Sequence, residues 1–171
     1  VMGVFPADHL VIGAQKFAKT VRSAIQISNK NNALVTIGIE PNFASTGYGY
    51  IQFDPQSTLD YLAGFKVKTF AEKPHEKLAK RFVSSGDFLW NGGMFVWKAE
   101  MILLQIKTYI PKLYQSLNTI NEALSTEKYK RQLEKEWDLI SPNSIVISKY
   151  NNQKISDDFI KKIKNFSRIV Q

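Results

Sequence analysis

Asp8 stands where an open α/β sheet would hold a ligand. The apolar run of residues 1–5, VMGVF, reads as a buried strand that ends at Pro6, because proline has no N–H to continue a ladder. In such sheets ligands bind just beyond the carboxyl ends of the strands, and a carboxylate there can hold a hard cation such as Mg²⁺. A single Asp after a strand is also typical of a turn or a helix cap, so both interpretations stay open. We expect His9 to be a structural hydrogen-bond donor rather than a base.

Two glycines, Gly47 and Gly49, enclose a tyrosine in the stretch STGYGYIQF, residues 45–53. Glycine has no Cβ, so a ligand can approach the backbone amides closely. Tight turns use glycine for the same reason. The pattern alone therefore leaves ligand contact and turn formation as alternatives.

An acid and a base stand side by side near the end of TFAEKP, residues 69–74, and an asparagine precedes two glycines in LWNGGMFVW, residues 89–97. Glu72 can accept hydrogen bonds from sugar hydroxyls, and Lys73 can neutralise a phosphate as a point charge. Asn91 can both donate and accept, which suits a ligand that bears hydroxyl groups. The alternatives are an exposed strand end with ordinary charges and a buried aromatic hairpin.

The elements that must position these residues follow from the hydrophobic periodicity. Residues 14–30 predict an amphipathic helix, and the β-branched residues 33–39 predict a second strand. A strand, a helix and a strand within the first 39 residues indicate an α/β fold with a parallel sheet and a crossover helix. The inward positions of the helix are expected to be Phe17, Val21, Ala24, Ile25 and Ser28.

Proline and glycine mark the boundaries of the later elements. A strand over 65–73 is expected to stop at Pro74, and a helix over 75–86 to be capped by Gly86. The remaining expectations are a strand-like segment after Gly49, a helical pattern over 99–137 broken at Pro111, a strand over 144–150 and a helix over 156–166.

Composition narrows the possible classes of protein. The 171 residues are 44% hydrophobic, enough for one globular domain with a core. They contain no cysteine and two histidines, which excludes a thiolate zinc site and a multi-histidine metal site, so any metal would rest on oxygen ligands. No signal peptide and no apolar run of roughly 20 residues occurs, and we expect a cytoplasmic protein without a membrane partner.

The net charge of +8 suggests anionic partners. The lysines, dense at 128–135 and 161–168, are more typical of solvated helix faces than of a nucleic-acid groove.

Four motifs together resemble one enzyme family. PADH (Pro6–His9), TIGIxPxxxxTGYGYI (Thr36–Ile51), FxEKP (Phe70–Pro74) and WNxGMF (Trp90–Phe95) occur in the order and spacing of mannose-1-phosphate guanylyltransferases. The resemblance covers residues 1 to about 115 and implies a Rossmann-like mixed sheet of the nucleotidyltransferase type. Bacterial members of this family are often one half of a bifunctional protein that also carries phosphomannose isomerase activity.

The resemblance implies a reaction and a role for each motif. The enzymes transfer a guanylyl group from GTP to mannose 1-phosphate, giving the GDP-mannose used in polysaccharide biosynthesis, and pyrophosphate. By motif, Asp8 would be a catalytic residue that binds Mg²⁺, and the Gly47 amide would contact the sugar. Glu72 would bind mannose hydroxyls, Lys73 would hold the sugar phosphate as a second catalytic residue, and Asn91 would add a sugar contact. In-line phosphoryl transfer needs mainly positioning and charge neutralisation, which such residues supply.

The chain also departs from the family pattern. It contains no Gly-rich loop with an arginine and a Pro-Lys pair, which holds the triphosphate in the family. Val146 replaces the acid of a Ser-Ile-Asp segment, no Trp-x-Asp-x-Gly supplies a second metal aspartate, and Gly92 stands where relatives often have serine. We therefore expect residues 1–171 to be the sugar-phosphate-binding part of a nucleotidyltransferase domain, with the N-terminal nucleotide-binding part missing and no turnover by this chain alone.

Three alternatives remain beside guanylyl transfer. The first is a nucleotidyltransferase that uses another base, and the second is an inactive domain that binds a sugar phosphate. A nucleic-acid-binding domain ranks last, because the sequence contains no motif for DNA or RNA. A homodimer is a possible assembly of the guanylyltransferase that the resemblance implies.

Overall fold

A computed structural model describes residues 1–58 and 64–140, together with the strand at 167–170. The chain forms two compact units, one built on Val1–Ala99 and the strand at 167–170, the other beginning at Glu100. The first unit holds β1 (Met2–Val4), α1 (Ala14–Asn31), β2 (Val35–Ile39), β3 (Tyr50–Phe53), β4 (Gly64–Ala71), α2 (Glu76–Ser85), β5 (Phe88–Trp97) and β6 (Ser167–Val170).

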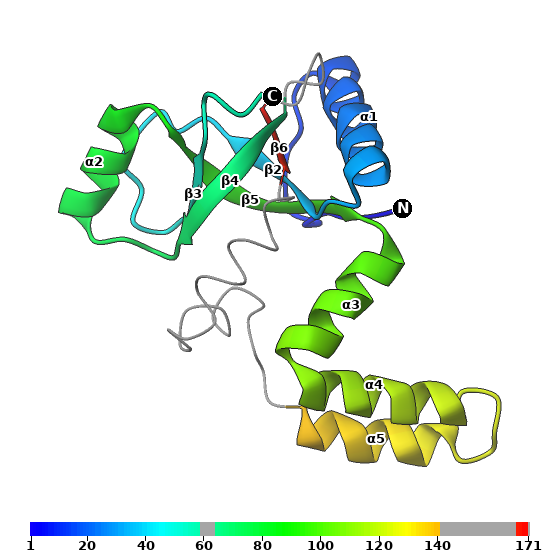
Figure 1. Ribbon diagram of the computed structural model, residues 1–171. Coiled ribbons are helices and arrows are strands. Elements are labelled where there is room, and N and C mark those ends of the chain that lie inside the picture. The colour runs from blue at the N-terminus through cyan, green and yellow to red at the C-terminus, as the bar shows by residue number, and fades with distance from the viewer. Residues whose placement is uncertain (59–63, 141–166, 171) are drawn as a thin grey trace. The chain divides into compact units, whose positions relative to one another are not determined.

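The strands of the first unit form one mixed sheet in the order β1-β5-β2-β6-β4-β3, and β3 also pairs with β5 (Figure 1). This confirms the α/β class. The expected parallel neighbours β1 and β2 do not pair, however, because β5 lies between them and is antiparallel to both. Parallel pairing occurs instead between β2 and β6, a strand that the sequence analysis missed.

The first strand forms where expected, but the expectation that it is buried was wrong. Among the strands that the structure describes, β1 pairs with β5 alone and so lies at the edge of the sheet. Met2 and Val4 keep 43% and 41% of their surface exposed, and Phe5 remains exposed although its ring makes an edge-on contact with Phe17. An apolar run predicts a strand, but it cannot tell whether a neighbour covers it.

Helix α1 forms as predicted and packs against the strands at the centre of the sheet. It starts after Gly13 and ends at Asn32, both in the left-handed conformation. Ala24 and Ile27 are fully buried, whereas Ile25, expected to face inward, is 37% exposed. This first core cluster consists of Ala24, Ile27, Ala33, Val35 and Val96.

A second core cluster lies under α2, which also forms as predicted. His75 caps its N-terminus by accepting a hydrogen bond from the Leu78 amide, and Gly86 at φ 75° ends it. Figure 1 shows α1 and α2 over different parts of the sheet. The cluster consists of Tyr50, Ala79, Phe88 and Trp90, with Ile39, Ala44, Ala71, Phe82 and Val83 packed against it.

The second unit contains the helices α3 (Ala99–Tyr109), α4 (Pro111–Ala123) and α5 (Tyr129–Leu139). The expected break at Pro111 is confirmed, and a turn after Ala123 adds a break that was not predicted. The basic residues at the start of α5 are exposed, in agreement with a solvated helix face. The strand expected over 144–150, the helix expected over 156–166 and Val146 lie outside the described residues.

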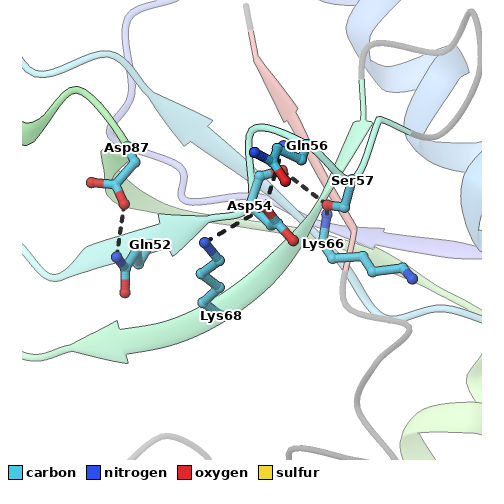
Figure 2. Close-up of polar contacts among 7 residues, drawn as sticks. All are labelled: Gln52, Asp54, Gln56, Ser57, Lys66, Lys68 and Asp87. Carbon is cyan, nitrogen blue, oxygen red and sulfur yellow. Dashed lines mark hydrogen bonds and ion pairs between the residues drawn. The ribbon is translucent and has the colours of Figure 1, made fainter.

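Polar contacts at the end where β3 finishes connect it to β4 and to the residue before β5 (Figure 2). The Gln52 amide donates to Asp87 over 2.7 Å, and Lys68 forms an ion pair with Asp54 at 3.5 Å. Burial alone would raise the pKa of Asp87, but the hydrogen bonds that its carboxylate accepts from Ser85 and Gln52 outweigh burial and lower the pKa. These contacts lie at the opposite end of the β3–β4 ladder from the Tyr50–Ala71 pair.

Replacement of Asp87 by asparagine is expected to lower the free energy of unfolding by about 1–2 kcal/mol at pH 7, because the side chain loses its charge and one of the two oxygens that accept hydrogen bonds. Because the pKa of Asp87 is lower in the folded state, its carboxylate stabilises the fold at pH values above the unfolded-state pKa of about 3.9. This stabilisation is lost as the pH falls through the pKa of Asp87 in the folded state. Urea unfolding between pH 3 and 7 should therefore show a weaker acid dependence in Asp87→Asn. The control Asp54→Asn, whose ion pair is half exposed, should lose less than about 1 kcal/mol. Equal acid dependence of Asp87→Asn and the unmodified chain would contradict the account.

Candidate functional site

The site is built on an unpaired stretch of β5. One edge of β5 pairs with β2, so β1 and β3 must share the other edge. β3 occupies it at Phe88–Trp90 and β1 at Phe95–Trp97, which leaves residues 91–94 without a described strand on that side. The chain before β3 reaches into this interval, where the Asn91 amide donates to the Gly49 carbonyl over 2.7 Å.

A bulge at the Gly-Gly pair shapes the same stretch. In β2, Ile37 is opposite Met94 and the next residue is opposite Asn91, so the two glycines have no partner there. Gly93 has φ 66°, which favours glycine, and its amide donates to Asn91 Oδ1 over 3.1 Å. β5 is therefore one bulged strand and not an aromatic hairpin. A Cβ on Gly93 would lie 3.4 Å from Pro6 Cγ, so the segment after β1 passes close to the bulge.

A cavity of about 400 Å³ opens at this interval. Asp8, from the segment after β1, and Asn91, from β5, both line this cavity although they lie far apart in the sequence. The remaining walls are aromatic and aliphatic. The lining consists of Asp8–Ile12, Ile39, Tyr48, Trp90–Gly92 and Met94.

Glu72 lies beside this cavity rather than in its wall. Its Oε2 atom is 3.7 Å from the place that a Cβ on Gly49 would occupy, and Asn91 Cβ is 3.6 Å from the same place. Glu72 and Asn91 therefore approach Gly49 together. The pairing of Tyr50 with Ala71 explains this proximity, because it brings the residue before β3 to the residue after β4.

Lys73 is exposed and follows Glu72, and it does not line the cavity. Its backbone has φ 29°, a left-handed conformation that is rare for a residue other than glycine, and the next residue is the buried Pro74. A residue before proline normally adopts an extended conformation. The backbone at Lys73 is therefore strained, a feature that clusters at functional sites in proteins.

Gly47 is placed differently from the expectation. Its amide already donates to Ser45 Oγ over 3.2 Å, and Gly47 does not line the cavity. The sequence allowed a ligand to approach both glycines, and the resemblance assigned the sugar contact to Gly47 rather than to Gly49, the glycine that lies between Glu72 and Asn91. The signal was present, since both glycines belong to TGYG, but only the strand pairing distinguishes them.

Replacement of Gly49 by alanine is expected to weaken binding of the sugar phosphate that the motif resemblance implies, mannose 1-phosphate, about tenfold without destabilising the fold. The backbone of Gly49 is not at positive φ, and a Cβ would make contacts of 3.6–3.7 Å, which are ordinary, so the substitution should change the free energy of unfolding by at most about 1 kcal/mol. The methyl group would nevertheless fill the space between Glu72 and Asn91. Gly47→Ala, where a Cβ meets only Ser45 Oγ at 3.7 Å, is the matched control and should bind as the unmodified chain does. Equal affinities for the two variants would be evidence against the assigned role of Gly49.

Asp8 could bind Mg²⁺ as a single protein carboxylate. The Asp8 carboxylate is exposed in the cavity wall and forms no ion pair within the described part of the chain. That part also contains no group of three or more His, Asp or Glu side chains that could hold a metal ion. Mg²⁺ is commonly bound through one or two carboxylates together with substrate phosphates and water. Asp8 can be such a carboxylate, provided that the other ligands come from the substrate and solvent.

His9 lines the cavity next to Asp8. We expected it to donate a structural hydrogen bond, but it makes none to any residue between 1–58 or 64–140. Nothing in the residue pattern indicated that it would lie in the cavity wall. It adds a polar ring beside the Asp8 carboxylate.

Comparisons with known proteins identify the class. A family model described as nucleotidyl transferase matches residues 1–140. The chain therefore belongs to the nucleotidyl transferase family. Within the described part, no helix combines the length and the apolar character needed to cross a membrane.

Curated relatives within this family include mannose-1-phosphate guanylyltransferases. A mannose-1-phosphate guanylyltransferase of Escherichia coli is 39% identical over 113 residues, which cover 66% of this chain and 24% of the relative. A second, from Escherichia coli strain K12, is 32% identical over 146 residues, 85% of this chain and 30% of the relative. The alginate biosynthesis protein AlgA of Pseudomonas syringae is 38% identical over 118 residues, 67% of this chain and 23% of the relative. The chain thus spans less than a third of the length of these relatives.

Solved structures show the same fold. A structure described as a mannose-1-phosphate geranyltransferase from Thermus thermophilus matches 98% of this chain and 43% of its own, with a TM-score of 0.74 at 20% identity. A mannose-6-phosphate isomerase from Helicobacter pylori matches 71% of this chain and 44% of its own, with a TM-score of 0.60 at 31% identity. The mixed sheet and its helices are therefore those of a nucleotidyltransferase fold.

Proposed function

We propose that the intact protein transfers a guanylyl group from GTP to mannose 1-phosphate, forming GDP-mannose and pyrophosphate, and that this chain supplies the sugar-phosphate end of the site. The observation that carries the proposal is that Asp8 and Asn91 line one cavity while Glu72 approaches Asn91 across Gly49. The names of the curated relatives support the choice of substrates.

Each side chain of the site contacts a different part of the proposed substrates. Glu72 accepts hydrogen bonds from mannose hydroxyls, and Asn91 donates to or accepts from another hydroxyl. Lys73 neutralises the sugar phosphate, whose oxygen attacks the α-phosphorus of GTP in line with the departing pyrophosphate. Mg²⁺ held by Asp8 would neutralise phosphate charge. No protein nucleophile is required.

The second candidate is an inactive domain that binds a sugar phosphate. It is favoured by one observation, that Asp8 is the single carboxylate among the described residues that line the cavity. The two candidates differ in the coupling between metal and sugar phosphate. An enzyme site that binds both ligands at neighbouring oxygens should bind mannose 1-phosphate more tightly with Mg²⁺ than without it. A binding domain should retain its affinity without the metal.

Calorimetric titration of the chain with mannose 1-phosphate, with and without Mg²⁺, tests the proposal. We expect Mg²⁺ to raise the affinity at least about fivefold, a coupling of about 1 kcal/mol, and mannose 6-phosphate to bind more weakly in both buffers. We also expect the 171-residue chain alone to form no GDP-mannose from GTP and mannose 1-phosphate. Unchanged affinity with Mg²⁺ would favour the binding domain, and absence of mannose 1-phosphate binding would refute the proposal.

A further inference from the structure

Three aromatic rings meet at the edge of the cavity. Trp90 is 8% exposed, and two rings pack against its indole: Phe43, with ring centroids 4.9 Å apart, and Tyr48, with ring centroids 5.0 Å apart. Both contacts are tilted or edge-on, the geometry that aromatic pairs prefer. The Trp90 indole therefore packs against both rings.

The two outer rings differ in what they face. Tyr48 is 48% exposed and lines the cavity, whereas Phe43 is 57% exposed and does not line it. The Tyr48 hydroxyl forms no hydrogen bond to the part of the chain that the structure describes. Tyr48 therefore packs against Trp90 and at the same time lines the cavity with an exposed part of its side chain.

The backbone on both sides of Tyr48 is held by hydrogen bonds. The Gly47 amide donates to Ser45 Oγ over 3.2 Å, and the Gly49 carbonyl accepts from the Asn91 amide over 2.7 Å. Tyr48 is thus positioned before any ligand arrives, by the hydrogen bonds of its two neighbours and by its ring contact with Trp90. A preordered ring loses little conformational entropy on binding.

The cavity combines this ring with polar groups on another wall. Asn91 lines the same hollow, and Glu72 approaches it across Gly49. A hexose presents C–H groups on its ring faces and hydroxyl groups around its rim. An aromatic ring suits the face and amide and carboxylate groups suit the rim.

We propose that Tyr48 is a specificity-determining residue whose ring supports one face of the hexose ring, while Asn91 and Glu72 bind its hydroxyl groups; this inference rests on the proposed binding of mannose 1-phosphate. The ring contact acts on the sugar and not on the phosphate. The phenol hydroxyl takes no part in it.

The test compares three variants, Tyr48→Ala, Tyr48→Phe and Phe43→Ala, with two probes, mannose 1-phosphate and inorganic phosphate. We expect Tyr48→Ala to bind mannose 1-phosphate about tenfold more weakly, which corresponds to about 1.4 kcal/mol, and to bind inorganic phosphate as the unmodified chain does. Tyr48→Phe keeps the ring and should stay within about twofold for both probes. Phe43→Ala removes a comparable contact with Trp90 outside the cavity, and it should also stay within about twofold.

Each contrary result has a distinct meaning. Tyr48→Ala within twofold for mannose 1-phosphate would overturn the inference and leave the proposed function standing. Equal losses for the sugar phosphate and for inorganic phosphate, or equal losses in Tyr48→Ala and Phe43→Ala, would show a general collapse of the site and overturn it as well. Failure of the unmodified chain to bind mannose 1-phosphate would remove the proposed function and this inference together. Circular dichroism of each variant confirms that the chain is folded before binding is measured.

Discussion

Asp8→Asn is expected to reduce GDP-mannose formation by the intact protein on the order of 10³-fold. The substitution keeps the size of the side chain but removes the only carboxylate among the described residues of the cavity wall, and lost stabilisation of developing phosphate charge has effects of this order. In the 171-residue chain the same substitution should abolish the dependence of mannose 1-phosphate binding on Mg²⁺. The first readout is the rate of GDP-mannose formation, and the second is calorimetry.

Glu122→Gln is the control for Asp8→Asn, because Glu122 is an exposed carboxylate in the second unit, on α4. It should leave both the rate and the metal dependence unchanged. An Asp8→Asn protein that still binds mannose 1-phosphate more tightly with Mg²⁺ would show that the metal is held elsewhere.

Lys73 offers a second large effect, in which binding and stability should change in opposite directions. Lys73→Met and Lys73→Gly both remove the ammonium group, and each should bind mannose 1-phosphate about 10- to 100-fold more weakly, since hydrogen bonds to charged groups contribute about 1.5–3 kcal/mol. Only glycine relieves the strained backbone at φ 29°. Lys73→Gly should therefore unfold at higher urea concentration, with a gain of about 1 kcal/mol, whereas Lys73→Met should not.

The matched control for Lys73 is Lys77→Met, on the exposed side of α2. It removes one positive charge from the same region, so it tests whether net charge alone attracts the phosphate. Comparable loss of affinity in Lys77→Met would mean that the contribution of Lys73 is a general field effect. Lower stability of Lys73→Gly than of the unmodified chain would refute the assignment of strain.

Hydrophobic periodicity and the positions of proline and glycine made the helices and strands largely predictable. Gly86 ends α2 where expected, and the periodicity of residues 14–30 placed α1 within one residue. The strand expected over 65–73 is shorter, since β4 ends at Ala71 and Lys73 has a left-handed backbone instead of the extended one. Strand pairing was less accessible, because it joins segments far apart in the chain. Nothing in the first 39 residues shows that β5, which begins at Phe88, inserts between β1 and β2.

In the candidate site too, residue types were predictable from the sequence, whereas features that depend on strand pairing were not. Residue types and motif spacing selected Asp8, Glu72 and Asn91, which the structure places around one cavity and one glycine. The register of Tyr50 opposite Ala71 decides which glycine of TGYG lies between Glu72 and Asn91, and a register cannot be read from glycine content. The left-handed backbone of Lys73 also depends on its surroundings, since lysine before proline predicts an extended residue.

The central claim is that Asp8, Gly49, Glu72, Lys73 and Asn91 act on one ligand. The most direct measurement is a nuclear magnetic resonance titration of the ¹⁵N-labelled chain with mannose 1-phosphate in the presence of Mg²⁺. We expect the backbone amide signals of these five residues to shift together, with one common dissociation constant. Shifts confined to the α3–α5 unit, or shifts at these five residues that follow different dissociation constants, would contradict the central claim.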